Sequence, residues 1–336
     1  ATAMYGSRAA NGVVVITTVA PKAGEVRVSY NFTGTLEMPD LRDYNLANAS
    51  EKLEIERLAG LFDKGQANIP STAVGMNNYY KKYALIQKGV DTDWMSIPLQ
   101  NSFNHKHSIY LEGGTPNLRY GVDGSFNIAD GVMKGTERNR YSAGFSLDYR
   151  IKNLQVRNYV SFGHTKSKES PYGSFSDFSG LQPYDSPYKD DGTLREKLTY
   201  SKISGRDNNN PLYEATLVID NLSFNWYLND YWTVKGQFSV TKKYSKSEKF
   251  IDPLSSKTSV TGSKDNNLAG DLYTTNGESL DWNSNAFLYY TRSFNKQHNL
   301  NVSAGWEAAS GTTESTNAHY RGFPSGEFHS LNYAAE

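Results

Sequence analysis

The sequence lacks cysteine altogether, and it also lacks a long apolar run and a net charge. Without cysteine there are no disulfides, no thiolate metal ligands and no thiol nucleophiles. No stretch approaches the roughly 18 apolar residues that a transmembrane helix needs. Lys and Arg together number 35, as do Asp and Glu, so the charge balance does not indicate nucleic acid or a broad anionic surface as a partner.

Hydrophobic residues are also scarce, whereas tyrosine is plentiful. They make up 38% of the chain and the mean hydropathy is -0.63, yet there are 24 tyrosines against five tryptophans. This composition fits two classes of protein. One is a well-hydrated, soluble all-β protein, and the other is a barrel in which apolar side chains occupy every second position.

The spacing of apolar residues favours the barrel. In 118–131 the even positions from Leu118 to Ile128 are apolar or small, and the odd positions from Arg119 to Asn127 are polar or small. Similar alternation recurs in 107–114, 140–150, 154–164 (broken by Asn158), 222–228, 232–240, 280–290 and 300–306. Alternation over about ten residues is typical of a membrane-spanning β-strand, whereas strands of soluble sandwiches usually have five or six residues. With 25–38 included, we expect about nine strands of an antiparallel, up-and-down transmembrane β-barrel.

The connections between these strands alternate between short and long. The short ones are GGTPN, IKN, NDY and NKQHN, which are rich in turn-forming residues, and the long ones lie at about 40–105, 129–140, 165–220 and 242–278. In an up-and-down sheet every second connection lies at the same end. Short turns at one end and long loops at the other are typical of an outer-membrane barrel, with periplasmic turns and extracellular loops.

Aromatic residues gather toward the ends of the expected strands. As a set they match the girdles found where a barrel wall meets the membrane surfaces, although any single one could equally be a half-buried strand residue. The set comprises Tyr110, Tyr149, Trp226, Trp232, Tyr289, Tyr290 and Phe294.

The longest connection, about 40–100, contains one helical pattern. Ser50 is suitably placed to cap its N-terminus ahead of a Glu-rich turn. The apolar positions that indicate a helix face are Leu46, Leu53, Leu58, Leu61 and Phe62. We therefore expect one short loop helix.

The first residues carry the most specific signal. A turn-like start and an Asn-Gly pair precede Val13–Thr18, a β-branched run typical of a buried strand. The stretch ATAMYGSRAANGVVVITT resembles the end of the plug domain in SusC/RagA-type TonB-dependent outer-membrane transporters, where a similar segment closes the plug just before the first barrel strand. The plug motif is carried by Tyr5, Gly6, Arg8, Asn11 and Gly12. Looser matches follow in the expected order, among them VSYNFTGT and RYGVDGSFNIADGVMKGTERNRY.

The resemblance implies a domain division and a mechanism. Residues 1–20 would be the C-terminal end of the plug and 21–336 the N-terminal portion of a larger plugged barrel in the bacterial outer membrane. The intact protein would import a large nutrient, a glycan or a peptide, beneath a SusD-like surface lipoprotein, with energy from the TonB-ExbB-ExbD complex. Arg8 would lie in the plug turn, although a satisfied polar residue near a strand explains it equally well. No cofactor, metal or nucleic acid is implied.

Candidate cargo contacts lie in the long segment 170–188. Its aromatic residues, interleaved with Ser, Asp and Gln, are Tyr172, Phe175, Phe178, Tyr184 and Tyr188. Aromatic faces stack on sugar rings or pack on apolar peptide side chains. The alternative, which we favour for a long loop, is that these rings pack the loop against its neighbours and hold it rigid.

We find no catalytic constellation, such as a phosphate-binding glycine loop, a G-x-S-x-G elbow or an H-E-x-x-H motif. His105 and His107 would share one strand face and could bind a metal with a third ligand, but two lumen or rim histidines near the start of a strand are the favoured interpretation. Besides the TonB-dependent importer, two functions stay open. They are a passive porin-like channel, and a soluble β-sheet that binds carbohydrate or acts as an adhesin. An enzyme is the least favoured class.

Overall fold

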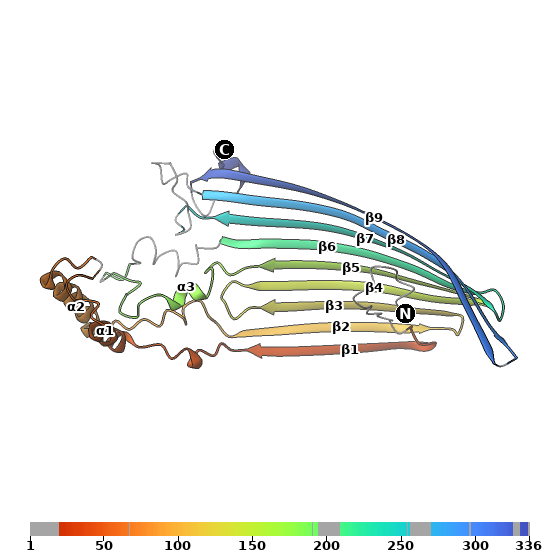
Figure 1. Ribbon diagram of the computed structural model, residues 1–336, viewed down its shortest axis with the longest axis horizontal. Helices are drawn as coiled ribbons and strands as arrows, with labels where there is room; N and C mark the ends of the chain where they lie inside the picture. The colour runs from red at the N-terminus through yellow and green to blue at the C-terminus, as the bar shows by residue number, and fades with distance from the viewer. Residues whose placement is uncertain are drawn as a thin grey trace.

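In the computed structural model the described residues form one antiparallel sheet of nine strands, and each strand pairs with its neighbours in sequence (Figure 1). The structure describes residues 20–66, 68–189, 191–193, 209–253, 255, 270–295, 297–324 and 330–334. The strands are β1 (Gly24–Glu37), β2 (Ser102–Gly114), β3 (Leu118–Asp130), β4 (Glu137–Ile151), β5 (Leu154–Lys168), β6 (Asn209–Tyr227), β7 (Trp232–Ile251), β8 (Gly270–Phe294) and β9 (His298–Phe323). The expected up-and-down topology and the number of strands are confirmed.

The register of the strands separates apolar from polar side chains. Val122 on β3 pairs with Leu111 on β2 and with Phe145 on β4, and Phe145 pairs in turn with Val160 on β5. Because side chains alternate along a strand, residues that pair in register project from the same face. The even positions of β3 and their partners therefore form an apolar face. The odd positions and their partners, which are mostly Ser, Thr, Asn and Gly, form a polar face.

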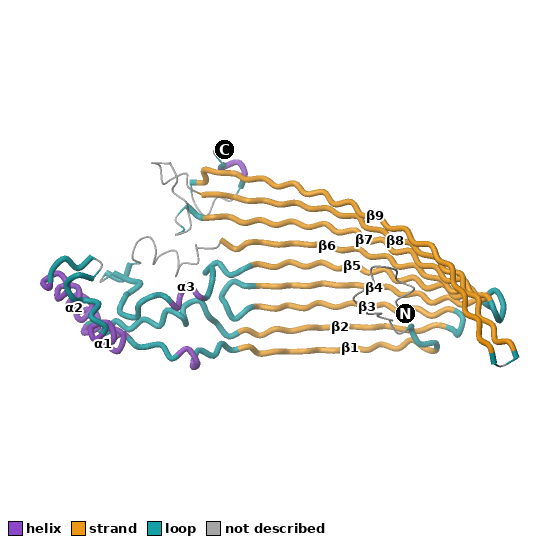
Figure 2. The backbone as a smooth tube through the Cα atoms, viewed as in Figure 1, coloured by secondary structure: helices purple, strands orange, loops and turns teal. Residues whose placement is uncertain are grey.

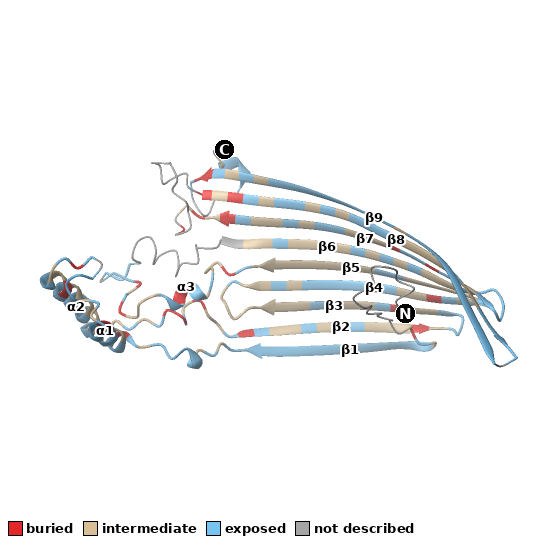
Figure 3. Ribbon diagram, in the orientation of Figure 1, coloured by how far each residue is buried: buried red, intermediate tan, exposed pale blue. Residues whose placement is uncertain are grey.

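The apolar face is left uncovered by the described residues. Large side chains on it, such as Phe126, Val160 and Trp306, are exposed. Figure 3 shows buried residues mainly where strands end and loops pack, as in the cluster of Phe250, Leu272 and Phe323. The sheet is thus a single layer. Within the part of the chain that the structure describes, the apolar side chains are therefore not the interior of a compact two-layer globule.

The connections sort by length between the two ends of the sheet (Figure 2). The short-turn end has 115–117, 152–153, 228–231 and 295–297 between its strands, whereas the long-loop end has 38–101, 169–208 and 252–269. One expectation was wrong in part. The connection between β3 and β4 spans only 131–136, because both strands continue past the last alternating residues.

The first long loop, 38–101, carries two helices rather than one, α1 (Ala49–Leu58) and α2 (Thr72–Gln87). The connection 169–208, the third at this end of the sheet and called the third loop below, carries the short α3 (Ser176–Ser179). Figure 1 places α1 and α2 beyond the strand ends, far from the sheet. None of the described helices has the length and apolar character required to cross a bilayer.

The N-terminus of α1 corrects the expectation for Ser50. The cap is Asn48, whose Oδ1 accepts from Glu51 N at 2.9 Å while Glu51 Oε2 accepts from Asn48 N at 3.0 Å. This reciprocal capping box needs a Glu three residues after the cap, which Asn48 has and Ser50 lacks. The expected apolar helix face is also only partly right, because Leu53 is buried but Leu58 is 71% exposed.

The aromatic girdle is present at the short-turn end of the apolar face, but two of its expected members are not in it. Trp232 and Tyr290 pair in register and their ring centroids lie 4.7 Å apart. Tyr110 pairs with Asp123, and Tyr289 with Thr233, so both tyrosines lie on the polar face. Nearness to a strand end does not determine the face, which depends on whether the position is odd or even in its strand.

Candidate functional site

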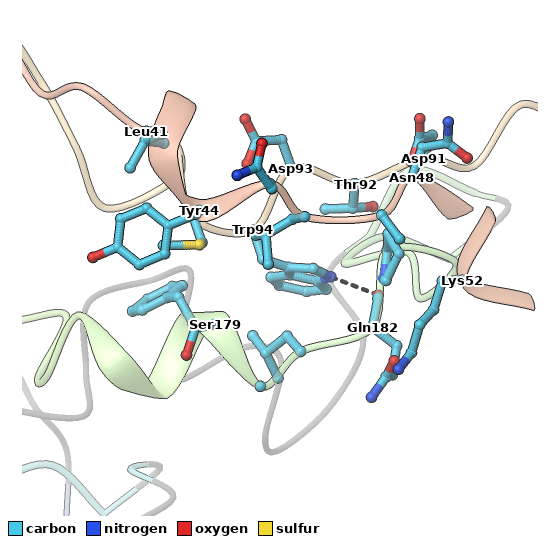
Figure 4. Close-up of a pocket in the computed structure, with 18 of the residues that line it drawn as sticks. Leu41, Tyr44, Asn48, Lys52, Asp91, Thr92, Asp93, Trp94, Ser179 and Gln182 are labelled. Atoms are coloured by element: carbon cyan, nitrogen blue, oxygen red, sulfur yellow. Dashed lines mark hydrogen bonds between the residues drawn. The ribbon is translucent and has the colours of Figure 1, made fainter. Parts of the chain in front are cut away.

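A hollow lies among the loops at the long-loop end, where residues 38–101 meet 169–193. It has a volume of about 730 Å³, and Tyr44, Asn48, Trp94, Ser179 and Gln182 are among its lining residues (Figure 4). Ligand sites of drug or sugar size usually have volumes of several hundred cubic ångströms. The cavity is therefore large enough for one or two sugar rings or a few peptide residues.

Three hydrogen bonds join the two loops beside this cavity. Trp94 Nε1 donates to Gln182 O at 2.8 Å, the bond drawn in Figure 4. Thr92 N donates to Pro183 O at 2.8 Å, and Thr92 Oγ1 donates to Asp185 O at 2.9 Å. Because all three acceptors are backbone carbonyls, the register between the loops is fixed without a particular side chain in the third loop.

The start of α1 supplies the polar side of the cavity. Asp91 Oδ1 accepts from Ala49 N at 2.9 Å, so this carboxylate is held at the helix N-terminus, where the helix dipole favours negative charge. Lys52 and Asn48 lie on the same side (Figure 4). Tyr44, which is 50% exposed, presents a ring at the opposite side, edge-on to Phe175 with centroids 5.9 Å apart. Amide and charged groups facing an exposed ring can bind a polar ligand that also has an apolar surface.

A buried polar cluster fastens the third loop to the helices behind the cavity. Tyr184 OH donates to Glu56 Oε1 at 2.7 Å, and Lys82 Nζ donates to Glu56 Oε2 and to Tyr184 OH, each at 2.8 Å. Glu56 belongs to α1 and Lys82 to α2, and the Lys82 ammonium also lies 4.3 Å from the centroid of the Tyr184 ring. Each buried polar group thus has a partner, which is what burial requires.

The surroundings of Tyr184 alter its acidity. Burial raises the pKa of Tyr184 well above its ordinary value, and so does the adjacent Glu56 carboxylate, which accepts a hydrogen bond from the Tyr184 hydroxyl. The phenol is therefore a hydrogen-bond donor throughout the neutral range. This geometry makes Tyr184 a fastening residue of the loop.

The five aromatic residues expected to contact cargo are found in different surroundings. Phe178 and Tyr184 are buried, and Tyr172 packs near Phe178 with ring centroids 6.4 Å apart. Phe175 is partly exposed beside Tyr44, and Tyr188 is 51% exposed. Phe178 lines the cavity, but the five rings do not form one continuous surface. A role for them in cargo binding stays a prediction.

The cavity residues missed from the sequence are Tyr44, Asp91 and Trp94, which all come from the first long loop. The segment VDTDW offered a weak signal, because it places two carboxylates and an indole together in a polar stretch. What the sequence did not indicate is that this segment meets residues 179–183, some ninety positions later. Contacts between loops leave no periodic pattern.

The plug-motif residues Tyr5, Gly6, Arg8, Asn11 and Gly12 lie outside the described part of the chain. The residues just before β1 are described, and they lie on the polar face. Lys22 N donates to Glu112 Oε2 at 2.8 Å, and a Cβ added to Gly121 would lie 3.2 Å from Pro21 Cγ. Both Glu112 and Gly121 are polar-face positions, so the chain enters β1 from that side.

His105 and His107 lie on the apolar face of β2 near the long-loop end. His107 Nδ1 is 2.5 Å from Tyr30 OH, and its ring stacks on Phe126 with centroids 4.5 Å apart. Among the described residues, no group of three or more His, Asp or Glu side chains could hold a metal ion. The two histidines form part of an aromatic cluster on the outside of the sheet.

No family profile matches the chain. It is 24% identical to TonB-dependent receptor P3 of Formosa agariphila over 97% of its own length and 31% of the receptor. It is 28% identical to TonB-dependent receptor SusC of Bacteroides thetaiotaomicron over 44% of its own length and 13% of that protein. The chain thus spans less than a third of the length of these curated relatives.

Among solved structures, the RagAB peptide transporter matches the whole chain with a TM-score of 0.77 and 17% identity, over 40% of the matched chain. The RagAB peptide importer in its open-open state gives a TM-score of 0.73, also over the whole chain. This likeness shows that the sheet has the fold of part of the RagA barrel wall. Together with the sequence relatives, it makes the chain similar to part of the SusC/RagA-type TonB-dependent receptors.

Proposed function

We propose that the protein to which this chain belongs imports a large nutrient, a glycan or a peptide, across the bacterial outer membrane with energy relayed by TonB. The observation that carries the proposal is the single-layer sheet with one apolar and one polar face, which matches the RagA wall over its whole length. Closing such a sheet satisfies every backbone group within a membrane and directs the apolar side chains to lipid. The polar face would then surround the path of the cargo.

The parts of the chain would have distinct roles in this importer. Residues 1–20 would end the plug, which is supported by the entry of the chain into β1 along the polar face. The cavity between the loops would hold part of the cargo on the outer side, beneath a SusD-like lipoprotein. The TonB-ExbB-ExbD complex would act through parts of the protein outside this chain.

A passive porin is the main alternative within the same fold. A plug segment ahead of β1 disfavours it, because a plugged barrel should be almost closed at rest. A soluble carbohydrate-binding sheet is disfavoured because the described residues provide no second layer over the apolar face. The names of the sequence relatives are those of receptors, and none of them is the name of an enzyme.

The proposal is tested by uptake in cells. Fluorescently labelled oligosaccharide and peptide pools would be offered to the native bacterium, to a strain without this gene, and to a strain without TonB. We expect one pool to accumulate only when both the gene and TonB are present. Uptake that persists without TonB would instead support a passive channel, and planar-bilayer conductance of the full-length protein would give the same discrimination.

A further inference from the structure

The charges on the polar face are segregated by level, which the alternation of side chains alone does not require. Three adjacent rows of residues, here called the outer polar rows, cross the sheet near its long-loop end. The first contains Thr33, Lys106, Asn127, Arg140, Thr165, Ala215, Ser245, Gly277 and Ser315. The second contains Asn31, Ser108, Ser125, Ser142, Gly163, Leu217, Lys243, Ser279 and Thr313. The third contains Ala129, Arg138, Ser167, Tyr213, Ser247, Thr275 and Asn317.

Every charged side chain in the outer polar rows is basic. These side chains are Lys106, Arg138, Arg140 and Lys243, and all are exposed. None of them has a salt-bridge partner among the described residues. Carboxylates lie on both sides of these rows, with Asp123 and Asp281 one row closer to the short turns. On the loop side, Glu37 accepts a hydrogen bond from Asn104, and Asp271 pairs with His319 and Arg321. A band of unpaired positive charge therefore crosses this face on its loop side.

The opposite face at the same level is built differently. There Lys166 pairs with Glu214 at 2.9 Å, Lys168 with Glu137 at 3.3 Å, and Lys242 with Glu278. Each of these apolar-face lysines is thus neutralised by a neighbouring strand. Unpaired like charges repel one another and destabilise the sheet. The unpaired basic side chains of the outer polar rows, which have no counterpart at this level of the apolar face, therefore suggest a ligand of opposite charge.

The other members of the outer polar rows indicate what else the ligand carries. Most are Ser, Thr, Asn or Gly, and Ser125 Oγ and Ser142 Oγ are hydrogen-bonded at 2.8 Å. Large apolar groups are few, chiefly Leu217 and Tyr213. Hydroxyl and amide groups suit the hydroxyls of a sugar, whereas a peptide would need pockets for apolar side chains. Lys106 and Arg140 lie two strands apart, or about 10 Å at the usual strand spacing, which suits anionic groups repeated along an oligosaccharide.

We propose that the outer polar rows bind an anionic oligosaccharide, one that carries carboxylate or sulfate groups, as it passes along the wall. Lys106, Arg138 and Arg140 are the principal contacts, and Lys243 extends the track to β7. The guanidinium groups offer paired donors to planar carboxylates and to sulfate oxygens. This inference rests on the proposed import function and specifies the class of cargo.

The test measures binding to the full-length protein in detergent by calorimetry at low and at physiological salt. The probes are a heparin hexasaccharide, which carries both uronate and sulfate, maltohexaose as its neutral counterpart, and hexaglutamate as an acidic peptide. The variant is K106Q/R138Q/R140Q. The control is K166Q/K168Q, which removes two lysines at the same level from the other face.

We expect the wild type to prefer the heparin hexasaccharide to both other probes. The triple variant should bind it about tenfold more weakly, with a smaller dependence on salt, while the control binds as the wild type does. Equal binding by wild type and triple variant, no binding of the heparin hexasaccharide at low salt, or a preference for hexaglutamate would overturn the inference. TonB-dependent uptake of neutral sugars or peptides would leave the import function standing in each of these cases, so the two failures are distinguishable.

Discussion

Single residues are most informative in this chain where a polar side chain lies in apolar surroundings. Glu56, Lys82 and Tyr184 satisfy one another inside the loop region, so their cost of burial is offset by mutual hydrogen bonds. Asn158 and Asp220 form a different pair. Asn158 Nδ2 donates to Asp220 Oδ1 at 2.6 Å, on the apolar face between Val160 and Leu222. The cluster of three fastens a loop, and the Asn158–Asp220 pair interrupts a surface that should meet lipid.

Replacing Tyr184 by Phe should loosen the third loop while leaving the sheet unchanged. The loss of the hydroxyl leaves Glu56 and Lys82 each without one buried partner, at a cost of about 1–3 kcal/mol. Hydrogen exchange at the Thr92 amide, which bonds Pro183 O, reports the docking directly and should become faster. Tyr188→Phe is the control, because this exposed residue lies in the same loop. Unchanged exchange in Tyr184→Phe would contradict the fastening role.

The same contact predicts a dependence on alkaline pH. The pKa of Tyr184 is raised in the folded state, so its contribution to docking is fully present below the pKa of an unfolded tyrosine, about 10, and is lost as pH rises beyond it. Protection of the Thr92 amide, corrected for intrinsic exchange, should stay level through neutral pH and fall above that value. The fall should be smaller in Tyr184→Phe. A loss of protection between pH 6 and 8 would require a different titrating group.

Removing the polar pair from the apolar face should stabilise the folded protein. In Asn158→Val/Asp220→Val the carboxylate and amide no longer face hydrocarbon, and we expect a gain of about 1–2 kcal/mol. The temperature at which heat-modifiable gel mobility is lost should rise. Asn225→Val, on the polar face of β6, should produce no such gain. A lower transition temperature in the double variant would mean that the pair contributes to stability.

At the scale of elements, the helix pair depends on one close approach. Gly75 in α2 is buried, and a Cβ added there would lie 1.8 Å from Phe62 O. Gly75→Ala should therefore force α2 away from the end of α1 and destabilise the pair by about 1–3 kcal/mol. Trypsin cleavage after Lys64 and Lys88 in the full-length protein should become faster. Gly180→Ala, which meets no atom within 4 Å, should be cleaved at the wild-type rate.

The elements also show where sequence reasoning succeeded and where it stopped. Alternation was recognised in eight of the nine strands, because each has an apolar and a polar face, and the remaining strand, β1, was expected at 25–38. Alternation underestimated the lengths of three strands: β7 runs to Ile251, β8 begins at Gly270, and β9 runs to Phe323. Beyond the apolar band both faces are polar, so the backbone ladder continues after the sequence pattern has ended. The helix α2 was missed because its tyrosines and lysines give no clear apolar stripe.

The candidate site was less predictable than the sheet for a related reason. The aromatic residues of 170–188 were recognised as a group, but their surroundings differ, as the contrast between buried Tyr184 and exposed Tyr188 shows. The partners of Tyr184 come from α1 and α2, more than a hundred residues earlier. The segregation of charge on the polar face was equally hidden, since it emerges only when the register of all nine strands is known.

At the scale of the whole molecule, the sheet of the described residues has two free edges, β1 and β9. In hydrocarbon every unpaired backbone N–H and C=O on such an edge would lack a partner, at a cost of several kcal/mol each. The curated relatives are about three times as long as this chain, so in a complete barrel other strands can pair with both edges. Barrel closure is therefore expected to require residues from outside 1–336.

The chain of 1–336 expressed alone should consequently fail to insert stably into a bilayer. Refolding into detergent micelles or lipid vesicles should give a species whose gel mobility is the same with and without heating, because no closed barrel resists the detergent. The full-length protein, refolded under the same conditions, should show two mobilities. A heat-sensitive, fast-migrating form of the isolated chain would contradict the argument, unless cross-linking shows that copies have paired edge to edge. Such pairing would satisfy the same backbone groups by another route, because β1 and β9 expose the donors and acceptors that a second sheet could match.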